Sequence, residues 1–166
     1  MVASISAVSS AAAAKSYYGK DNYYAKANDR PEPSAWFGKG SDRLGLKGEV
    51  DLETFERVLE GQTLDGKRVG QKPGETLEQA MERPHRPGVD LTFSPPKDVS
   101  LLLYLGGDKR LLAAHRAAVT ETLKWVEKNM AGTRIRPPVA EGEKQKPPVP
   151  VKTGNLVIAK FEHDIS

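Results

Sequence analysis

The fold of this chain is decided by the stretch Val89-Asp90-Leu91-Thr92-Phe93-Ser94-Pro95-Pro96-Lys97. Apolar and polar residues alternate over residues 89–93, which predicts a β-strand with one apolar face directed at a helical layer. Proline is tolerated at the start of a helix, so the two prolines favour a helix that follows at residues 97–105. We expect this helix to be buried, because most of its residues are apolar. A strand that leads directly into a helix indicates a domain built from both elements.

The downstream sequence continues this mixed pattern. Asp108 is a candidate N-cap for the longest helix, which we expect to extend through Met130. Residues 133–136 and 155–165 predict two further strands. Between them, residues 137–150 hold five of the 12 prolines together with several charges, which is typical of an extended, mobile loop.

The upstream sequence predicts one strand and two capped helices. Residues 2–8 alternate as in a strand, and two serines that precede residues 11–18 can cap a helix there. A second helix is predicted over residues 51–60, with Asp51 as its N-cap. Residues 28–48 are rich in proline and glycine, so we expect them to be irregular.

Composition limits the kinds of protein that this chain can be. Its 166 residues suffice for one domain with a core, and no apolar run is long enough to cross a bilayer, so we expect no membrane insertion. The absence of cysteine excludes disulfides and thiolate metal sites, and a cytoplasmic protein fits this composition. The net charge is +3, and residues 1–48 carry seven basic and four acidic residues. This balance permits an anionic partner.

Two pairs of adjacent tyrosines, Tyr17-Tyr18 and Tyr23-Tyr24, hold four of the five tyrosines. Such side chains can pack in a core, and they can also stack on the bases of single-stranded nucleic acid. A third interpretation is nucleophilic catalysis, in which a phenol forms a covalent intermediate and needs activation because its pKa is near 10. The residue types alone leave all three interpretations open.

Other candidate site residues are a carboxylate and the histidines. Asp90 alternates with apolar neighbours and must face either solvent or a polar site. His163 lies on one face of the strand predicted at residues 155–165, whereas His85 and His115 are expected to be solvated and structural, respectively. The spacing of the three histidines matches no metal-binding signature.

The order of several motifs resembles that of a known family. The sequence contains the two tyrosine pairs, then Gly45-Leu46-Lys47-Gly48, then Asp90-Leu91-Thr92-Phe93-Ser94-Pro95-Pro96-Lys97, and finally Phe161-Glu162-His163-Asp164. This order resembles the N-terminal relaxase domain of conjugative plasmid relaxases of the TrwC/TraI type, in the HUH endonuclease superfamily. The resemblance extends over nearly the whole chain.

The resemblance implies a fold, a reaction and a partner. The implied fold is α+β, an antiparallel sheet with helices on one face and the active site on the other. The implied activity is a DNA strand transferase that nicks one strand at a plasmid transfer origin through a tyrosine, which becomes joined to the 5′ phosphate. The implied partners are the single-stranded DNA and the hairpin of that origin, with other conjugation proteins as further candidates.

The resemblance also implies roles for individual residues. Tyr17 matches the first nucleophile, Tyr23 matches the tyrosine of the second transfer, and Tyr18 and Tyr24 complete the two pairs. Asp90 matches the active-site aspartate, which would orient a metal-ligating histidine or accept a proton.

A divalent metal ion, Mg²⁺ or Mn²⁺, is the implied cofactor. His163 matches the first of three histidine ligands, and the family places the other two in a downstream His-x-His that this sequence lacks. We therefore expect residues 1–166 to be the N-terminal portion of a single relaxase domain, incomplete at its C-terminus, with weak or no metal binding. We also expect Asp90 and His163 to share the sheet face that points away from the helix at residues 108–130.

Two alternatives to a catalytic fragment remain. A non-catalytic module could bind single-stranded DNA through tyrosine stacking and the basic first third of the chain. An inactive α+β domain that only retains the motifs is the other alternative.

Overall fold

The computed structural model of the chain describes residues 2–19, 34–138, 142, 144 and 146–162. The described strands are β1 (Val2–Ala7), β2 (Ser34–Phe37), β3 (Val89–Ser94), β4 (Gly132–Ile135), β5 (Val149–Lys152) and β6 (Ile158–Phe161). The described helices are α1 (Ala11–Tyr18), α2 (Lys39–Arg43), α3 (Leu52–Leu59), α4 (Leu77–Met81), α5 (Lys97–Gly106) and α6 (Lys109–Met130). The mixture of helices and antiparallel strands confirms the expected α+β class.

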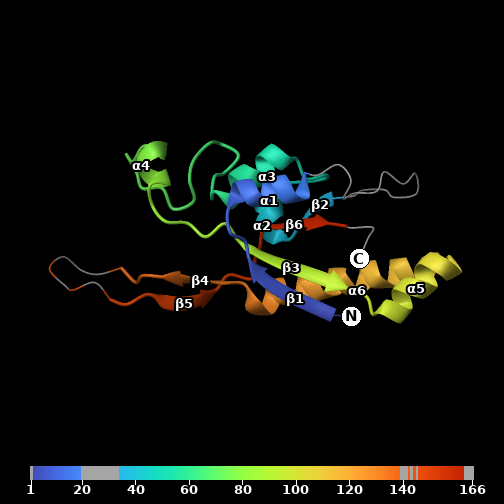
Figure 1. The fold of residues 1–166 in the computed structure, drawn as a ribbon. Helices are drawn as coiled ribbons and strands as arrows, with labels where there is room; N and C mark the ends of the chain where they lie inside the picture. Colours follow the sequence, from blue (N-terminus) through green and yellow to red (C-terminus); the bar gives the residue numbers. More distant parts are fainter. Residues whose placement is uncertain (1, 20–33, 139–141, 143, 145, 163–166) are drawn as a thin grey trace.

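The described strands form three antiparallel pairs rather than one continuous sheet. β1 pairs with β3, β2 pairs with β6, and β4 pairs with β5. Figure 1 shows that β1–β3 runs alongside the long helix α6 and that α1, α2 and α3 gather around β2–β6. The β4–β5 hairpin projects away from the rest of the described chain.

The first helix begins and ends where its sequence predicts. The Ser10 side chain accepts a hydrogen bond from the backbone N–H of Ala13 at 3.1 Å, and Gly19 is the C-cap. α1 packs against α3, and Lys15 on α1 forms an ion pair with Glu56 on α3, with 2.7 Å between Nζ and Oε2. The caps determine where α1 begins and ends, and the ion pair holds it against α3.

A small core lies beneath α1 and α3. Asp51 caps α3 by accepting a hydrogen bond from the backbone N–H of Thr54 at 2.8 Å, as its sequence position predicts. The helix then places Phe55 in the core, where it meets Ala14 and Val50. Partly buried hydrophobic residues from α1, β2 and β6 surround this cluster, so the core joins segments from both ends of the chain.

α5 corrects one expectation, because it is not buried in the described part of the chain. Leu101, Leu102 and Leu105 are 50%, 59% and 84% exposed, and Gly107 ends the helix in the left-handed conformation with φ of 65°. A run of leucines identifies an apolar surface but does not supply a partner for it. The main packing partner of α5 among the described elements is α6, which covers only one side.

The segment expected to be irregular contains β2 and α2. Gly40 lies against the backbone of the residues that precede β6, because its N–H donates to the carbonyl oxygen of Leu156 at 2.9 Å. A Cβ at residue 40 would come within 2.5 Å of the same oxygen, so the close approach requires glycine. The glycines of this segment therefore permit close packing as well as turns.

The loop expected at residues 137–150 is shorter at its end than the sequence indicated. Val149 and Pro150 belong to β5, where they pair with Ile135 and Arg134 of β4. Proline is accepted in such an edge strand because the missing N–H costs no ladder hydrogen bond there. Residues 139–141, 143 and 145 lie outside the described residues, and the mobility of the loop stays a prediction.

A buried carboxylate holds three segments together. Glu127 of α6 is 5% exposed, and its Oε1 accepts hydrogen bonds from the backbone N–H of Lys39 at 2.7 Å and of Leu156 at 2.8 Å. Lys39 is the first residue of α2, and Leu156 precedes β6. Glu127 therefore fixes both segments to the long helix.

Candidate functional site

A cavity of about 870 Å³ lies between α6, β1–β3, β6 and the end of α1. Most of its wall is apolar and comes from these elements. The polar and aromatic side chains that border it include Tyr17, Tyr18, Asp90, His115, Arg116 and Glu162. The cavity therefore brings together residues from the start, middle and end of the chain, and it includes three of the predicted site residues.

The two tyrosines of the first pair have different surroundings in the structure. Tyr17 is 44% exposed, whereas Tyr18 is half-buried and its ring stacks on Phe161 with 4.5 Å between the ring centroids and an interplanar angle of 13°. Tyr18 also meets Phe55 edge to face at 5.8 Å. Of the interpretations that the sequence left open, packing describes Tyr18, and Tyr17 keeps a surface that a substrate can reach.

Asp90 belongs to a polar face of the β1–β3 pair. It lies opposite Ser6, and Thr92 lies opposite Ser4, so four polar residues share one face of the two strands. Asp90 is half-buried and borders the cavity. Residues of both faces of β3 border this cavity, and Asp90 does so from the polar face.

The opposite face of β3 differs from its prediction. We expected Val89, Leu91 and Phe93 to be covered by the helical layer, but Val89 and Leu91 are 61% and 37% exposed and only Phe93 is half-buried. The alternation correctly predicts a strand, yet β1 is the only described strand that pairs with β3. The apolar face thus forms part of the cavity wall instead of a closed core.

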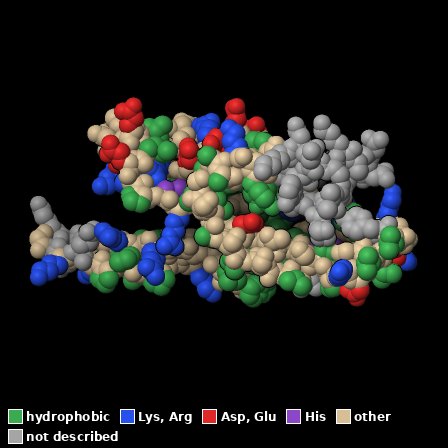
Figure 2. Space-filling view, in the orientation of Figure 1, with side chains coloured by type: hydrophobic (Ala, Val, Ile, Leu, Met, Phe, Trp, Pro, Cys, Tyr) green, Lys and Arg blue, Asp and Glu red, His purple; other side chains and the backbone are tan. Residues whose placement is uncertain are grey.

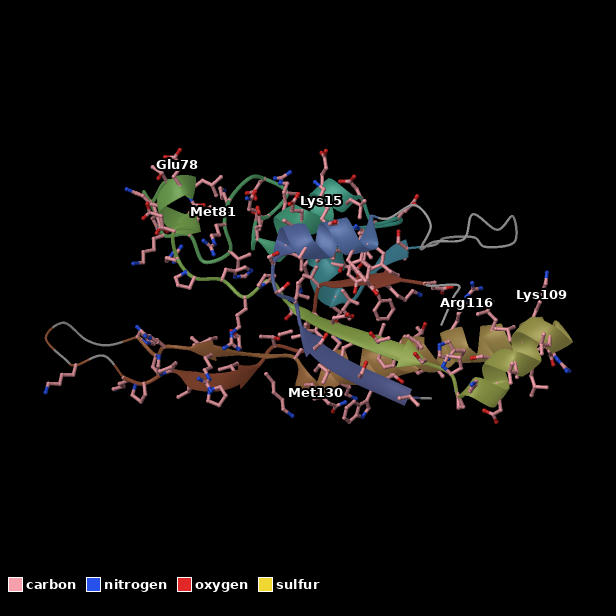
Figure 3. All side chains as sticks on the ribbon, in the orientation of Figure 1. Lys15, Glu78, Met81, Lys109, Arg116 and Met130 are labelled. Carbon is pink, nitrogen blue, oxygen red and sulfur yellow. The ribbon has the colours of Figure 1, made fainter. Side chains whose placement is uncertain are left out.

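An ion pair that the sequence analysis did not predict crosses the cavity wall. Arg116 of α6 donates from Nε and Nη2 to both carboxylate oxygens of Glu162, at 2.8 to 3.1 Å. Figure 3 shows Arg116 on α6 near the end of β6. No local sequence motif predicts this ion pair, because its partners are 46 residues apart in the sequence. A bidentate contact of this kind fixes the direction of both side chains.

The two faces of the end of β6 have different partners. Phe161 packs against Tyr18 of α1, whereas the next residue, Glu162, pairs with Arg116 of α6. Successive side chains of an extended strand point to opposite sides, which accounts for this division. The end of β6 is therefore held between the tyrosine-bearing helix and the long helix.

Some predicted site residues are outside the part of the chain that the structure describes. These are Tyr23, Tyr24 and His163, so the expectation that His163 shares a sheet face with Asp90 stays a prediction. The strands that carry or precede these two residues, β3 and β6, belong to different described pairs.

The described residues do not by themselves form a metal site. Among them, no group of three or more His, Asp and Glu side chains is arranged to hold an ion. The carboxylate of Glu162 is engaged by Arg116, which leaves Asp90 and His115 as the other candidate donors on the cavity wall. The donor set of the described residues thus does not fit a divalent ion.

Lys15, on the helix that bears the tyrosines, is held in its charged form. A hydrogen bond to Glu56 raises the pKa of Lys15, although partial burial acts in the opposite direction. Lys15 is therefore a positive charge one turn before the tyrosine pair. Its charge is neutralised by Glu56, so the pair joins α1 to α3 and does not form an anion-binding site.

A basic surface lies on the projecting hairpin. Arg134 and Lys152 are exposed on β4 and β5, and Arg136 follows β4. Figure 2 shows Lys and Arg side chains along this arm. In the sequence, the connection between the strands contains Glu141 and Glu143 together with Lys144 and Lys146, so the hairpin as a whole is basic.

The fold agrees with that of solved conjugative relaxases. The chain superimposes on the metal-free conjugative relaxase TrwC in complex with OriT DNA with a TM-score of 0.72, at 34% identity over 99% of this chain and 51% of that one. A TrwC complex with a 27-mer DNA comprising the recognition hairpin and the cleavage site gives a TM-score of 0.70 at 33% identity, over 99% and 50% of the two chains. A metal-bound TrwC structure gives 0.72 at 35% identity, over 99% and 52%. The class defined by this fold is therefore the conjugative relaxase fold.

The family follows from the sequence comparison. The TrwC relaxase family model matches residues 11–166, and the chain belongs to the TrwC relaxase family. It is also 43% identical over 164 residues to the multifunctional conjugation protein TraI of Escherichia coli strain K12. That match covers 98% of this chain and 8% of the relative, and the chain spans about half the length of the TrwC structures. In the described part of the chain, no helix is long and apolar enough to cross a membrane.

Proposed function

We propose that this chain is the N-terminal portion of a single relaxase domain, residues 1–166, which nicks one DNA strand at a plasmid transfer origin. The observation that carries this proposal is Tyr17, an exposed phenol at a cavity that also contains Asp90. Membership of the relaxase family supports a tyrosine nucleophile at this place. TrwC structures that contain OriT DNA support origin DNA as the substrate.

The proposed chemistry is a transesterification by the Tyr17 oxygen. The phenol loses its proton as its oxygen attacks the scissile phosphorus, and the bond from phosphorus to the 3′-oxygen of the preceding nucleotide breaks. The 5′ phosphate becomes joined to Tyr17, and the departing 3′-oxygen takes up a proton to give a free 3′-hydroxyl. Asp90 is the candidate to accept the phenolic proton or to orient the group that does. The second pair, Tyr23 and Tyr24, would serve a later transfer.

A divalent ion belongs to the complete site in this proposal. TrwC has been solved in a metal-bound form, and such an ion would supply positive charge for the phosphate. The described donors do not fit an ion by themselves, so we propose that Mg²⁺ or Mn²⁺ binds weakly to the 166-residue chain, with His163 as one ligand. Isothermal calorimetry with each ion measures this affinity, and tight binding would contradict the proposal.

The DNA-binding surface is proposed to have two parts. Single-stranded DNA enters the cavity beside Tyr17, and duplex DNA of the hairpin meets the cations of β4–β5, because backbone phosphates attract Lys and Arg. The reaction would take place in the cytoplasm, where plasmid DNA lies, and other conjugation proteins are candidate partners.

The cavity also supports the proposal that residues 1–166 are the N-terminal portion of a single, longer domain. The TrwC structures that match over the whole of this chain are about twice as long. In a longer domain, further residues would pack on the exposed apolar face of β3, which includes Val89 and Leu91. This packing would reduce the cavity to a smaller active site.

Covalent capture of DNA tests the proposed function. A label at the 5′ end would leave with the released fragment and would not mark the adduct. The label is therefore placed on the 3′ side of the scissile phosphate, and the adduct is followed by denaturing gel electrophoresis. Tyr17→Phe should abolish the labelled adduct, because it removes only the attacking oxygen. Tyr104→Phe in α5 is a matched control for loss of a phenolic oxygen. An undiminished adduct in Tyr17→Phe would exclude Tyr17 as the nucleophile.

The alternative, a non-catalytic module that binds single-stranded DNA, has a separate test. The half-exposed Tyr17 ring and the basic surface of β4–β5 support binding without cleavage. Binding that persists in Tyr17→Phe, weakens with added salt and is accompanied by no adduct in the wild-type chain would favour this alternative.

A further inference from the structure

We propose that Tyr18 is a positioning residue, whose ring holds the neighbouring Tyr17 in the orientation needed for attack. This inference rests on the proposed function, in which Tyr17 is the nucleophile. It assigns different roles to two adjacent tyrosines that the sequence motif does not distinguish.

Tyr18 is fixed by rings from two distant elements. It stacks on Phe161 of β6 at 4.5 Å and meets Phe55 of α3 edge to face at 5.8 Å. Phe55 and Phe161 also contact each other, with centroids 5.3 Å apart and an interplanar angle of 72°. The three rings form a closed cluster, so Tyr18 cannot shift without disturbing both α3 and β6.

Tyr17 is joined to this cluster through Tyr18. The two rings are 5.0 Å apart and nearly perpendicular, with an interplanar angle of 88°. This edge-to-face geometry is a favoured aromatic contact. Phe55 makes no ring contact with Tyr17, so the cluster reaches Tyr17 through the ring of its neighbour.

The position of Tyr17 in its helix explains why such support matters. Tyr17 lies in the last turn of α1, with Gly19 as the C-cap, and the last turns of helices fray. It is also 44% exposed, so the protein covers only part of its ring. Attack on phosphorus needs the oxygen within about 3 to 3.5 Å of its target, and a misplacement of about 1 Å can cost on the order of 100-fold in rate.

The ring of Tyr18, rather than its hydroxyl, carries this role. The three ring contacts involve aromatic faces and edges. Tyr18→Phe should therefore restore what Tyr18→Leu removes. A hydroxyl that took part in proton transfer would give the opposite result, because Phe and Leu would then be equally impaired.

Three variants separate positioning from stability. Tyr18→Leu removes the supporting ring, Tyr18→Phe keeps it, and Phe55→Leu removes a ring of the same cluster that does not contact Tyr17. Urea unfolding first measures the stability of each variant. Single-turnover adduct formation then gives the maximal rate and the DNA concentration at half-maximal rate.

We expect Tyr18→Leu to lower the maximal rate by about 10- to 100-fold, with a change of less than about threefold in the half-saturating DNA concentration. Tyr18→Phe should recover most of the rate, and Phe55→Leu should lose stability with a much smaller loss of rate. Equal losses of rate in the two leucine variants would overturn the inference, and so would an equal loss in Tyr18→Phe and Tyr18→Leu.

If the wild-type chain forms no adduct, that result contradicts the proposed function but not the role of Tyr18. A measurement that needs no catalysis then tests the role of Tyr18. The chain is labelled with 3-fluorotyrosine, and the ¹⁹F resonance of residue 17 is identified by its disappearance in Tyr17→Phe. We expect this resonance to shift in Tyr18→Leu, which removes the ring that meets Tyr17, and to stay in place in Phe55→Leu. An unchanged resonance in Tyr18→Leu would show that Tyr18 does not hold Tyr17.

Discussion

Replacement of Glu127 should destabilise the chain more than any surface substitution on the same helix. Glu127→Ala removes the Oε1 atom that accepts hydrogen bonds from the backbone N–H groups of Lys39 and Leu156 at 2.7 and 2.8 Å. The site is 5% exposed, so water can replace the carboxylate only after the surrounding segments move. The substitution therefore leaves two partly buried backbone donors without their acceptor.

The magnitude follows from these two donors. A hydrogen bond to a charged acceptor contributes about 1.5–3 kcal/mol, and an orphaned buried donor costs about 1–3 kcal/mol. With some local relaxation, we expect Glu127→Ala to lower the free energy of unfolding by about 3 kcal/mol. Glu127→Gln keeps an acceptor oxygen and loses only its charge, so we expect a loss of about 1 kcal/mol.

Urea unfolding followed by circular dichroism measures both changes, and similar slopes against urea would show that the compared states are alike. The matched control is Glu121→Ala on the same helix, where the side chain is 71% exposed and pairs only with Lys124. This control should lose less than about 0.5 kcal/mol, because exposed ion pairs contribute little. A loss in Glu127→Ala no larger than in the control would refute the argument that this carboxylate joins α2 and the approach to β6 to α6.

Three further predictions concern a helix cap, a buried arginine and an ion pair. The hydrogen bond from the backbone N–H of Thr54 lowers the pKa of Asp51, so the Asp51 carboxylate stabilises the fold above the unfolded pKa of about 3.9, and this stabilisation is lost as the pH falls through the lower folded value. Thermal melts should show that Asp51→Asn flattens the dependence of stability on pH in this acidic range. An unchanged pH profile would contradict this prediction. Arg68 is 7% exposed and donates a hydrogen bond to the carbonyl oxygen of Ala80 in α4. Arg68→Met should therefore speed amide exchange in α4 at least about tenfold, which corresponds to a local loss of stability of at least about 1.4 kcal/mol. Unaltered exchange would show that Arg68 does not anchor this helix. Arg116→Ala should lower the free energy of unfolding, measured with urea, by about 1 kcal/mol, because the bidentate ion pair with Glu162 is partly exposed. Arg116→Lys should recover less than half of this loss. Full recovery of stability in Arg116→Lys would mean that charge alone matters.

Local signals in the sequence predicted the elements whose ends are determined locally. Ser10, Asp51 and Asp108 each cap the helix that their position indicates, and the alternation after Gly88 gives β3. These features depend on residues a few positions apart, so a single sequence contains the information that they need.

Elements that depend on distant partners were not predicted. β2 is four residues long and follows from its pairing with β6, and α2 requires the close approach of Gly40 to Leu156. The exposure of α5 was missed for the related reason that leucine content does not identify the surface that would cover it. Tertiary contacts decide these features.

The candidate site shows the same division. The motif identified Tyr17, Tyr18 and Asp90, and the structure places all of them at one cavity. Their separate surroundings could not be predicted, because the partner of Tyr18 is Phe161, far along the chain, and the pair of Arg116 and Glu162 has no signature in the sequence.

The pairing of β2 with β6 has a consequence for synthesis on the ribosome. Ser34 pairs with Phe161, so translation must proceed past residue 161 before this pair can form. Until then Tyr18 lacks the ring on which it stacks, and the core beneath α1 has no strand to close it. Long-range strand pairing is slow, because the entropy of closing a long loop is lost before any contact compensates for it. The helix that bears the tyrosines therefore leaves the ribosome well before residue 161, whose ring completes its surroundings.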